Sequence, residues 1–388
     1  MLTVLVYITL FLLIGYAALI IYYRQSWLGI HEHRSLTSDI IPTTKITVII
    51  PARNEEENIN ACLNSIAKQS YPKNLFDIIV VDDFSTDKTA DIVRSFSDVR
   101  LISLNNFVTE KINSYKKKAI EIAIQQSSGD LIVTTDADCI VPPNWLQTIA
   151  VFYEKEQAAF IAMPVLITSS NTFIEMFQSL DFMTLQGITG ASVNKKFHSM
   201  CNGANLAYTR QAFGEVDGFK NIDTIASGDD MLLMHKIAER HPDKVKFLKS
   251  HDVIVQTKPV SSVKEFFNQR IRWASKADKY NDKSILPVLM LVYFLNVMLL
   301  ILPVIALFNS STLSIINYQL SIIRVWLLLL ALKTLVELFF LFPVATFFNR
   351  TNLLWWFPVA QPFHIVYTVI AGWLGKFGSY QWKERQVK

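Results

Sequence analysis

Four long apolar segments divide the chain into a mixed middle and two hydrophobic ends. The first covers residues 1–23, which contain no charged side chain. The other three lie near the carboxyl end, at residues 285–308, 321–341 and 353–374. A helix that crosses a bilayer needs about 20 apolar residues, and each segment is long enough. We therefore predict a multi-pass integral membrane protein, with one span at 1–23 and about three segments within 284–376.

The middle of the chain alternates short apolar runs with amphipathic stretches. The runs show no polar alternation, as is usual for strands buried on both faces of a parallel sheet. The amphipathic stretches carry apolar residues at helical spacing. The expected strands are residues 46–50, 76–81, 99–104 and 130–133, and the expected helices are 56–69 and 116–126. This order predicts an α/β domain over residues 46–260, after a linker at 24–45, with a mostly parallel sheet between layers of helices.

Acidic side chains follow two of the expected strands. Asp82 and Asp83 come after the second strand, and Asp136 and Asp138 come after the fourth. The carboxyl ends of parallel strands meet at one edge of the sheet, where open α/β folds bind ligands. Four carboxylates there repel one another unless a cation or a ligand's donors compensate, and such oxygens suit Mg²⁺ or Mn²⁺. The pattern predicts a nucleotide and metal site, although aspartates after a strand can also cap the next helix.

Composition narrows the remaining classes of function. The net charge is only +4, and no stripe of basic and aromatic residues suggests nucleic acid. The three cysteines, Cys62, Cys139 and Cys201, are odd in number and follow no metal-ligand spacing, which suits a reducing compartment. The sequence contains neither a G-x-G-x-x-G motif nor a P-loop, which argues against a dinucleotide oxidoreductase and a P-loop ATPase.

Basic residues on both flanks indicate that the middle domain is cytosolic. Arg24 and Arg34 precede it, three lysines follow it, and the loop 309–319 carries no charge. The lysines are Lys276, Lys279 and Lys283. Three carboxyl-terminal spans would place the basic tail at 377–388 outside, which conflicts with the rule. Either one segment is re-entrant or lies in the interface, for which Pro358 and Pro362 make the last segment the candidate, or the rule fails here.

Six short motifs follow one another along the chain. They are P-A-R-N-E-E at 51–56, Q-S-Y-P at 69–72, V-V-D-D-F-S-T-D at 80–87, D-A-D at 136–138, S-G-D-D at 227–230 and Q-R-I-R-W at 269–273. Together they resemble the membrane-embedded branch of the family 2 glycosyltransferases, which have a GT-A fold. That branch includes cellulose, chitin and hyaluronan synthases and ceramide-type glucosyltransferases. The resemblance covers residues 46–273.

The resemblance implies a nucleoside diphosphate sugar as donor, usually a UDP-sugar, and transfer with inversion. It implies that Asp138, with Asp136, ligates the metal and that Asp230 is the general base for the acceptor hydroxyl. The residues expected around the nucleotide are Pro51, Arg53, Glu55, Asp82, Asp83, Asp136 and one of Lys116 and Lys117. Gln269, Arg272 and Trp273 would close over the diphosphate and the acceptor entrance, and Asn202, Gly203 and Asn205 resemble the acceptor-side segment.

The acidic motif departs from the family pattern, and several motifs also have simpler explanations. It reads Asp-Asp where many relatives have Glu-Asp, so Asp229 is a second candidate for the base. Both aspartates could instead cap the helix expected at 231–240. The lysines near 116 could form a solvated face, and the segment 202–205 could be a tight turn. The amphipathic stretch 261–283 could border the membrane and carry the Q-x-x-R-W motif at the same time.

We therefore expect a membrane-anchored, metal-dependent glycosyltransferase whose active site opens to the cytosol. Its acceptor would be a lipid or a growing glycan at the membrane surface. About four helices are few for a polymer channel within one chain, which favours a lipid over the processive synthesis of a polysaccharide. A non-catalytic binding module with a GT-A fold is the remote alternative, and it would be expected to have lost some of Asp138, Asp230 and Arg272.

Overall fold

A computed structural model describes most of the chain. The described residues are 2–34, 41–110, 112–168, 172–197, 200–225, 228–275, 285–308, 312–315, 318–377, 380–382 and 385–387. The chain divides into two compact units, one of Met1–Gly29, Ser170–Gly187 and Val260–Lys388, and one of Ile30–Ser169 and Ile188–Pro259. Below they are called the helical unit and the sheet unit. Ser227 of the acidic motif and the flanking lysines Lys276, Lys279 and Lys283 lie outside the described residues.

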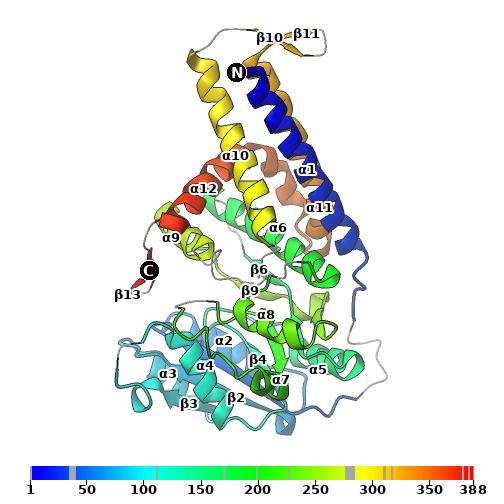
Figure 1. Cartoon of the computed structure of the whole chain (residues 1–388). Coiled ribbons are helices and arrows are strands. Elements are labelled where there is room, and N and C mark those ends of the chain that lie inside the picture. Colours follow the sequence, from blue (N-terminus) through cyan, green and yellow to red (C-terminus); the bar gives the residue numbers. More distant parts are fainter. Residues whose placement is uncertain are drawn as a thin grey trace. The chain divides into compact units, whose positions relative to one another are not determined.

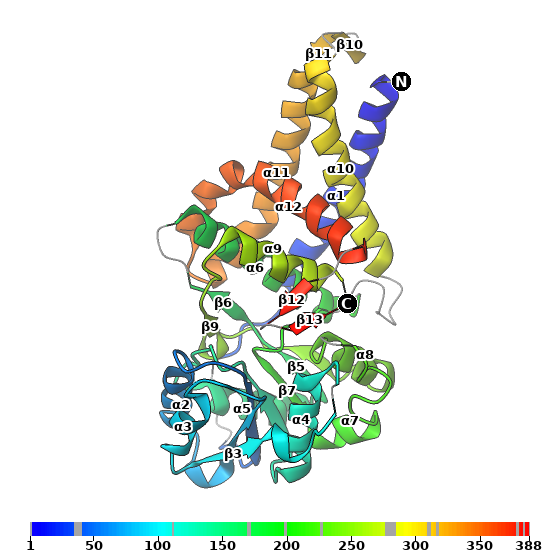
Figure 2. The ribbon, with the colours of Figure 1, turned by 90° about the vertical axis from the view of Figure 1, so that its left-hand side faces the viewer.

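A seven-stranded, mostly parallel sheet forms the centre of the sheet unit (Figures 1 and 2). Its order is β3-β2-β1-β4-β7-β5-β8, in which β7 runs antiparallel to both of its neighbours. The strands are β1 Ile46–Ala52, β2 Phe76–Asp82, β3 Val99–Ser103, β4 Leu131–Thr134, β5 Phe160–Ala162, β7 Leu206–Thr209 and β8 Val245–Phe247. The first four are the predicted strands, and they pair in parallel as predicted. The other three, of three or four residues each, are too short to show a period in the sequence.

The register of the central strands sets the position of the loops that follow them. β1 is apolar on both faces, and Val48, Ile49 and Ile50 are fully buried. Ala52 at the end of β1 lies opposite Asp82 at the end of β2, and on the other side of β1 Ile49 lies opposite Thr134, the last residue of β4. The three strands therefore end at one edge of the sheet, and the motifs that follow each of them meet there.

Helices of the sheet unit connect these strands. They are α2 Ile59–Ala67, α3 Thr89–Arg94, α4 Tyr115–Gln126, α5 Trp145–Glu156, α7 Arg210–Glu215 and α8 Met231–Arg240. The helix expected at 56–69 is shorter than predicted because the residues before α2 are tied to the loop after β2. Asn54 has a φ of 51°, and the N–H of Glu55 donates to Thr89 Oγ1 at 2.7 Å. These constraints hold the chain in a turn until Ile59.

The helical unit contains the membrane-length helices. Its helices are α1 Leu2–Leu28, the first part of α6 Phe173–Lys195, α9 Val263–Ala274, α10 Ile285–Phe308, α11 Ile322–Phe347 and, after a 3-10 turn at Thr351–Trp356, α12 Phe357–Phe377. The described residues hold four helical segments long and apolar enough to cross a membrane, Leu2–Leu28, Ile285–Ile305, Ile322–Phe347 and Thr351–Phe377. The predicted arrangement of an α/β domain with such helices at both ends of the chain is thus confirmed.

Three pairs of short strands complete the description. They are β6 Val165–Ile167 with β9 Val255–Thr257, β10 Thr312–Ile315 with β11 Tyr318–Ser321, and β12 Tyr380–Trp382 with β13 Arg385–Val387. Of these, β6 and β9 matter for the site, because β9 ends beside the loop that follows β4.

Within the helical unit, α1, α10 and α11 run side by side, whereas α12 lies across one end of them, next to α9 (Figures 1 and 2). A buried polar network attaches α12 to α11. Lys333 on α11 donates to Glu337 at 2.6 Å and to the side chain of Gln361 on α12 at 2.9 Å. Tyr16 on α1 donates to Glu337 at 2.5 Å. Lys333 and Glu337 are therefore paired inside the unit, as charged residues within long apolar helices usually are.

Candidate functional site

Hydrogen bonds join the loops after β1 and β2 at the carboxyl edge of the sheet. The N–H of Asp83 donates to the carbonyl of Ala52 at 2.8 Å. The guanidinium of Arg53 donates to the carbonyls of Asp83 at 2.9 Å and Phe84 at 3.2 Å. Phe84 has a φ of 55°, a conformation that costs energy for a bulky side chain and is tolerated where the surroundings fix it. Four residues predicted to hold the nucleotide, Arg53, Glu55, Asp82 and Asp83, thus belong to one rigid double loop, and Pro51 lies in the strand that leads into it.

Lys116 joins the loop after β4 to the start of α8. Its ammonium lies 2.7 Å from Asp136 Oδ1 and 3.2 Å from Asp229 Oδ2. Burial alone lowers the pKa of this lysine, but Asp136 and Asp229 together outweigh burial and raise it above its ordinary value. Lys116 is therefore a fixed positive charge between the D-x-D motif and the acidic motif. The two motifs are far apart in sequence, and the fold brings them to one place.

Asp230 begins α8 and is also held by the acceptor-side segment. One oxygen of its carboxylate accepts the N–H of Met231 at 2.7 Å, so it caps the helix as the simpler explanation predicted. The other oxygen accepts the N–H of Gly203 at 3.2 Å. A Cβ atom added to Gly203 would stand 3.2 Å from both Asp229 Oδ2 and Lys116 Nζ, so a larger residue would require these side chains to shift by a few tenths of an ångström. The catalytic role of Asp230 remains a prediction.

Two residues predicted for the site instead stabilise the interior. Lys117 is 2% exposed, and its ammonium donates to the carbonyls of Ile222 and Ile225, both at 2.7 Å. Asn205 is fully buried: its amide donates to the carbonyls of Pro164 and Val253 and accepts from the indole of Trp145 at 3.0 Å. Neither side chain faces the aspartates, which leaves Lys116 as the lysine at this edge.

The segment that contains Asn205 is a turn. The N–H of Ala204 donates to the side chain of Asn202 at 2.9 Å, and the N–H of Asn205 donates to the carbonyl of Asn202 at 3.2 Å. The tight-turn explanation thus holds for 202–205. Of the three residues predicted on the acceptor side, Gly203 contacts the acidic motif, because its backbone N–H donates to Asp230.

Asp136 and Asp138 offer oxygen ligands for a divalent cation. Both carboxylates are half-buried. Asp138 accepts weakly from Cys139 Sγ at 3.5 Å and from Thr257 Oγ1, at the end of β9, at 3.4 Å. Among the described residues no group of three or more His, Cys, Asp or Glu side chains could hold a metal ion by itself. This donor set fits Mg²⁺ or Mn²⁺, which proteins often bind through one or two carboxylates and the phosphates of a substrate.

Two buried cysteines lie next to this pair. Burial raises the pKa of the Cys62 and Cys139 thiols, with Asp138 and Asp136 adding to the effect. Both side chains are buried and pack beside the loop that follows β4. Thr257 was not predicted as a neighbour of Asp138, because a three-residue strand leaves no pattern in the sequence.

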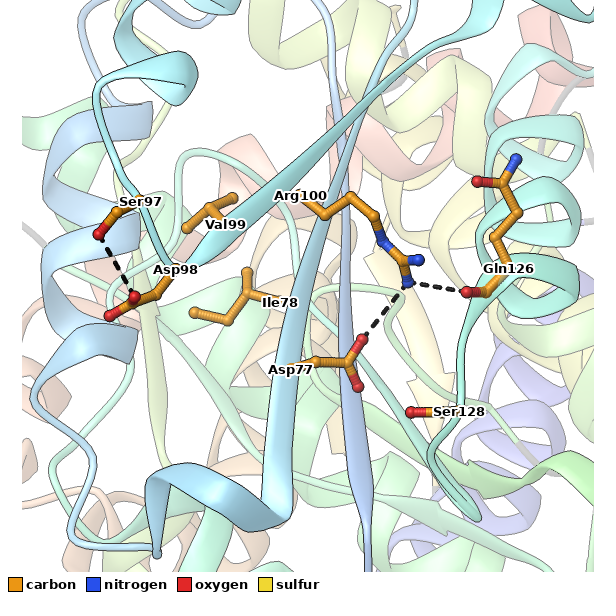
Figure 3. A pocket seen from close by; sticks show the side chains of 8 residues that line it. All are labelled: Asp77, Ile78, Ser97, Asp98, Val99, Arg100, Gln126 and Ser128. Atoms are coloured by element: carbon orange, nitrogen blue, oxygen red, sulfur yellow. Dashed lines mark hydrogen bonds and ion pairs between the residues drawn. The ribbon is translucent and has the colours of Figure 1, made fainter.

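A surface hollow of about 490 Å³ lies at the other edge of the same sheet (Figure 3). It is lined by residues from the beginnings of β2 and β3 and from the end of α4. Arg100 lies 3.6 Å from Asp77 there and donates to the carbonyl of Gln126 at 2.8 Å. The four aspartates stand at the carboxyl ends of the strands, so this hollow is not the predicted site. Asp98, one of its lining residues, is exposed.

The Q-x-x-R-W motif lies on α9, in the helical unit. Gln269, Arg272 and Trp273 are half-buried, whereas Arg270, between them, is buried. The side chain of Gln269 accepts from Arg270 at 2.7 Å. The predicted interface helix at 261–283 is thus described as far as Ser275, and Phe266 and Ile271 on its apolar face pack into a core with α6 and α12. The role of Arg270 was missed, although the residue stands inside the motif.

Comparison with known proteins gives partial matches to glycosyltransferases. The family model described as "Glycosyl transferase family 2" matches residues 47–217. Glycosyltransferase AglE of Haloferax volcanii is 38% identical over 102 residues, 26% of this chain and 33% of that protein. Probable glycosyltransferase YdaM of Bacillus subtilis is 28% identical over 240 residues, 59% of this chain and 54% of that protein. The chain thus spans between a third and about half of the length of these two relatives.

A third relative and one solved structure extend the comparison. The dolichyl N-acetyl-alpha-D-glucosaminyl phosphate 3-beta-D-2,3-diacetamido-2,3-dideoxy-beta-D-glucuronosyltransferase of Methanococcus voltae is 25% identical over 59% of this chain and 72% of its own length. The mannosyltransferase PcManGT of Pyrobaculum calidifontis, solved with GDP-Man and Mn²⁺, has a TM-score of 0.57 and 18% identity over 96% of this chain and 99% of its own. That likeness shows the fold, which is the predicted GT-A fold. These relatives and this structure are all named as glycosyltransferases, and the family model matches residues 47–217, less than half of the chain.

Proposed function

We propose that this protein transfers a sugar from a nucleotide sugar to a lipid acceptor at the membrane surface, with inversion and with a divalent cation. One observation carries the proposal: Lys116 bridges Asp136 of the D-x-D motif and Asp229 of the acidic motif. The groups expected for the donor and for the base therefore lie within one small region of the sheet unit. The presence of GDP-Man and Mn²⁺ in the PcManGT complex and the dolichyl phosphate in the name of the Methanococcus relative support the same function.

In this proposal, the double loop of Arg53, Glu55, Asp82 and Asp83, with Pro51, holds the nucleoside. Asp136 and Asp138 would hold Mg²⁺ or Mn²⁺ together with the donor's phosphates, and the cation would stabilise the charge that develops on the leaving diphosphate. Lys116 is already a fixed cation beside Asp136 and adds to that stabilisation. By motif resemblance, Gln269, Arg272 and Trp273 act on the diphosphate and at the acceptor entrance.

Asp230 is the proposed base. The acceptor hydroxyl oxygen attacks the anomeric carbon, its proton passes to the Asp230 carboxylate, and the bond from that carbon to the diphosphate oxygen breaks with its electron pair on the diphosphate. An alcohol is a poor nucleophile at pH 7 and needs such a base within hydrogen-bond reach. Asp229 is the weaker candidate, because its carboxylate is already paired with Lys116. Two backbone N–H groups hold the orientation of Asp230.

We also propose that the sheet unit is cytosolic and that three helices, α1, α10 and α11, cross the bilayer. In that arrangement α12 lies in the interface, across the end of the other three (Figures 1 and 2). Three crossings instead of four return the basic tail to the side of the sheet unit, as the positive-inside rule requires. Trp355 lies in the turn before α12 and is 87% exposed, and Trp373 lies near the end of α12 and is 59% exposed. Such exposure suits aromatic side chains at headgroup level.

The test is nucleotide release by detergent-purified protein from a panel of UDP- and GDP-sugars. Each donor is given with Mn²⁺, Mg²⁺ or EDTA, and with or without a total lipid extract. We expect lipid-stimulated, metal-dependent release from one donor and at least a 100-fold loss, on the order of removing a catalytic group, in Asp138→Ala and Asp230→Asn.

Asp98→Asn is the matched control, because it makes the same exchange at the opposite edge of the sheet. It should release nucleotide at the wild-type rate. A chain-like product without lipid stimulation would replace the lipid acceptor by a growing polysaccharide. Absence of release from every donor, with all variants alike, would reject the enzyme and leave a binding module.

A further inference from the structure

Arg270 stands in the second position of the Q-x-x-R-W motif, but its side chain points into the core of the helical unit. It is 4% exposed. Its Nε and Nη2 atoms both donate to Asp181 Oδ2 on α6, at 3.0 Å and 2.7 Å. The other carboxylate oxygen of Asp181 accepts the hydroxyl of Tyr367 on α12 at 2.5 Å. The ion pair therefore ties three helices of the unit at one point.

The same guanidinium contacts two side chains of its own motif. Its Nη1 donates to the side chain of Gln269 at 2.7 Å. Its central carbon lies 4.2 Å from the centre of the Trp273 ring and 4.6 Å from that of Phe266. Arginine is planar and can use both its edges and its face at once, so one side chain orients both Gln269 and Trp273.

Packing alone does not explain a buried charge pair here. Apolar rings from the three helices already form a core around it: Phe177, Phe266, Phe363 and Tyr367 lie with ring centres 4.7 to 6.3 Å apart. Replacing a buried ion pair by apolar side chains of similar volume is often neutral or stabilising. A charge pair in such a core adds hydrogen bonds of defined direction to the apolar contacts.

We propose that Asp181, Arg270 and Tyr367 are positioning residues, which set the orientation of Gln269 and Trp273 for glycosyl transfer. This inference rests on the proposed function, because its readout is the transfer reaction. It assigns to the second position of the motif a role inside the helical unit. It also includes the Tyr367 hydroxyl on α12 among the groups that orient the motif.

The first test is Tyr367→Phe, which removes the hydroxyl and leaves the ring in the aromatic core. We expect kcat to fall about tenfold, the donor KM to change less than twofold and the melting temperature to stay near wild type, since a misplaced contact costs the transition state more than the ground state. Tyr293→Phe on α10 is the matched control, because its hydroxyl makes no hydrogen bond among the described residues. It should retain full activity. Wild-type kcat in Tyr367→Phe would overturn the inference.

The second test separates positioning from stability. The triple variant Asp181→Leu, Arg270→Met, Tyr367→Phe fills the same space with apolar groups, so it should melt at or above the wild-type temperature. A stable triple variant with kcat reduced at least tenfold supports the inference, and a stable one with wild-type kcat rejects it. If the triple variant does not fold, Tyr367→Phe decides. Wild-type protein that turns over no donor would be a failure of the proposed function, which is a different result.

Discussion

Gly203 lies where an added methyl group would press on the ion pair between Lys116 and Asp229. Its backbone N–H holds Asp230, and the space where a side chain would stand is bordered by Asp229 and Lys116 at 3.2 Å. We expect Gly203→Ala to fold but to lose at least tenfold in kcat, because the ion pair of Lys116 and Asp229 beside the proposed base must shift by a few tenths of an ångström. The measurement is kcat for the donor identified by nucleotide release.

Gly214→Ala is the control at the same scale. Gly214 lies within α7, has no atom within 4 Å of an added Cβ and does not have a positive φ. Alanine there should leave kcat unchanged and stabilise the fold by about 0.5–1 kcal/mol, since glycine loses more conformational freedom on folding. Equal activity of the Gly203 and Gly214 variants would show that the contact around Lys116 is not part of the site.

Adjacent residues also show what sequence could not resolve at this scale. Lys116 and Lys117 were interchangeable by motif, but successive residues of a helix point about 100° apart. In α4 that turn sends Lys116 to the aspartates and Lys117 to the carbonyls of Ile222 and Ile225. The sequence does not show which of the two lysines faces the aspartates, because that depends on where the loop at 222–225 lies. In the same way, the three buried partners of Asn205 come from segments that the sequence pattern did not connect.

At the scale of elements, the pair Lys333–Glu337 connects α11 to α12 through hydrogen bonds to Gln361. Both side chains are buried, at 0% and 5% exposure, and they share Gln361 as a partner. Glu337→Gln should destabilise the helical unit by about 3–5 kcal/mol, because it leaves the Lys333 ammonium buried without a counter-charge. The measurement is the melting temperature in detergent. Removing the charge as well, in Lys333→Met/Glu337→Gln, should recover much of the loss.

A cycle of these variants tests whether the pair acts as a unit. Side chains in contact are expected to show a coupling energy of about 0.5–3 kcal/mol, whereas independent sites add. A double variant that melts below Glu337→Gln would mean that the two residues contribute separately. The pairing itself was readable from the sequence, because residues four apart on a helix share a face. The link to Gln361 was not readable, because it joins two segments whose crossing depends on packing.

For the whole molecule, the sequence predicted more of the architecture than of the arrangement of the site. Long apolar segments and unbroken apolar strands predicted the membrane-length helices and the parallel half of the sheet, and α8 and α10 begin and end at the expected residues. The antiparallel β7 and the short strands β5 and β8 were not predicted, because three or four residues show no period. The motif order predicted which loops meet at the sheet edge. It did not predict that Arg270 faces inward, since a motif specifies residue types and not their directions.

The proposed function is the transfer of sugar from a nucleotide donor to a membrane acceptor at the edge where Lys116 joins Asp136 and Asp229. The most direct measurement is the incorporation of radiolabelled sugar from that donor into the organic phase of a lipid extract, by wild type, Asp138→Ala and Asp230→Asn. We predict one discrete labelled glycolipid with wild type, abolished by EDTA and by both substitutions. Label that reaches lipid equally well with Asp230→Asn, or none with wild type from any donor, would contradict it.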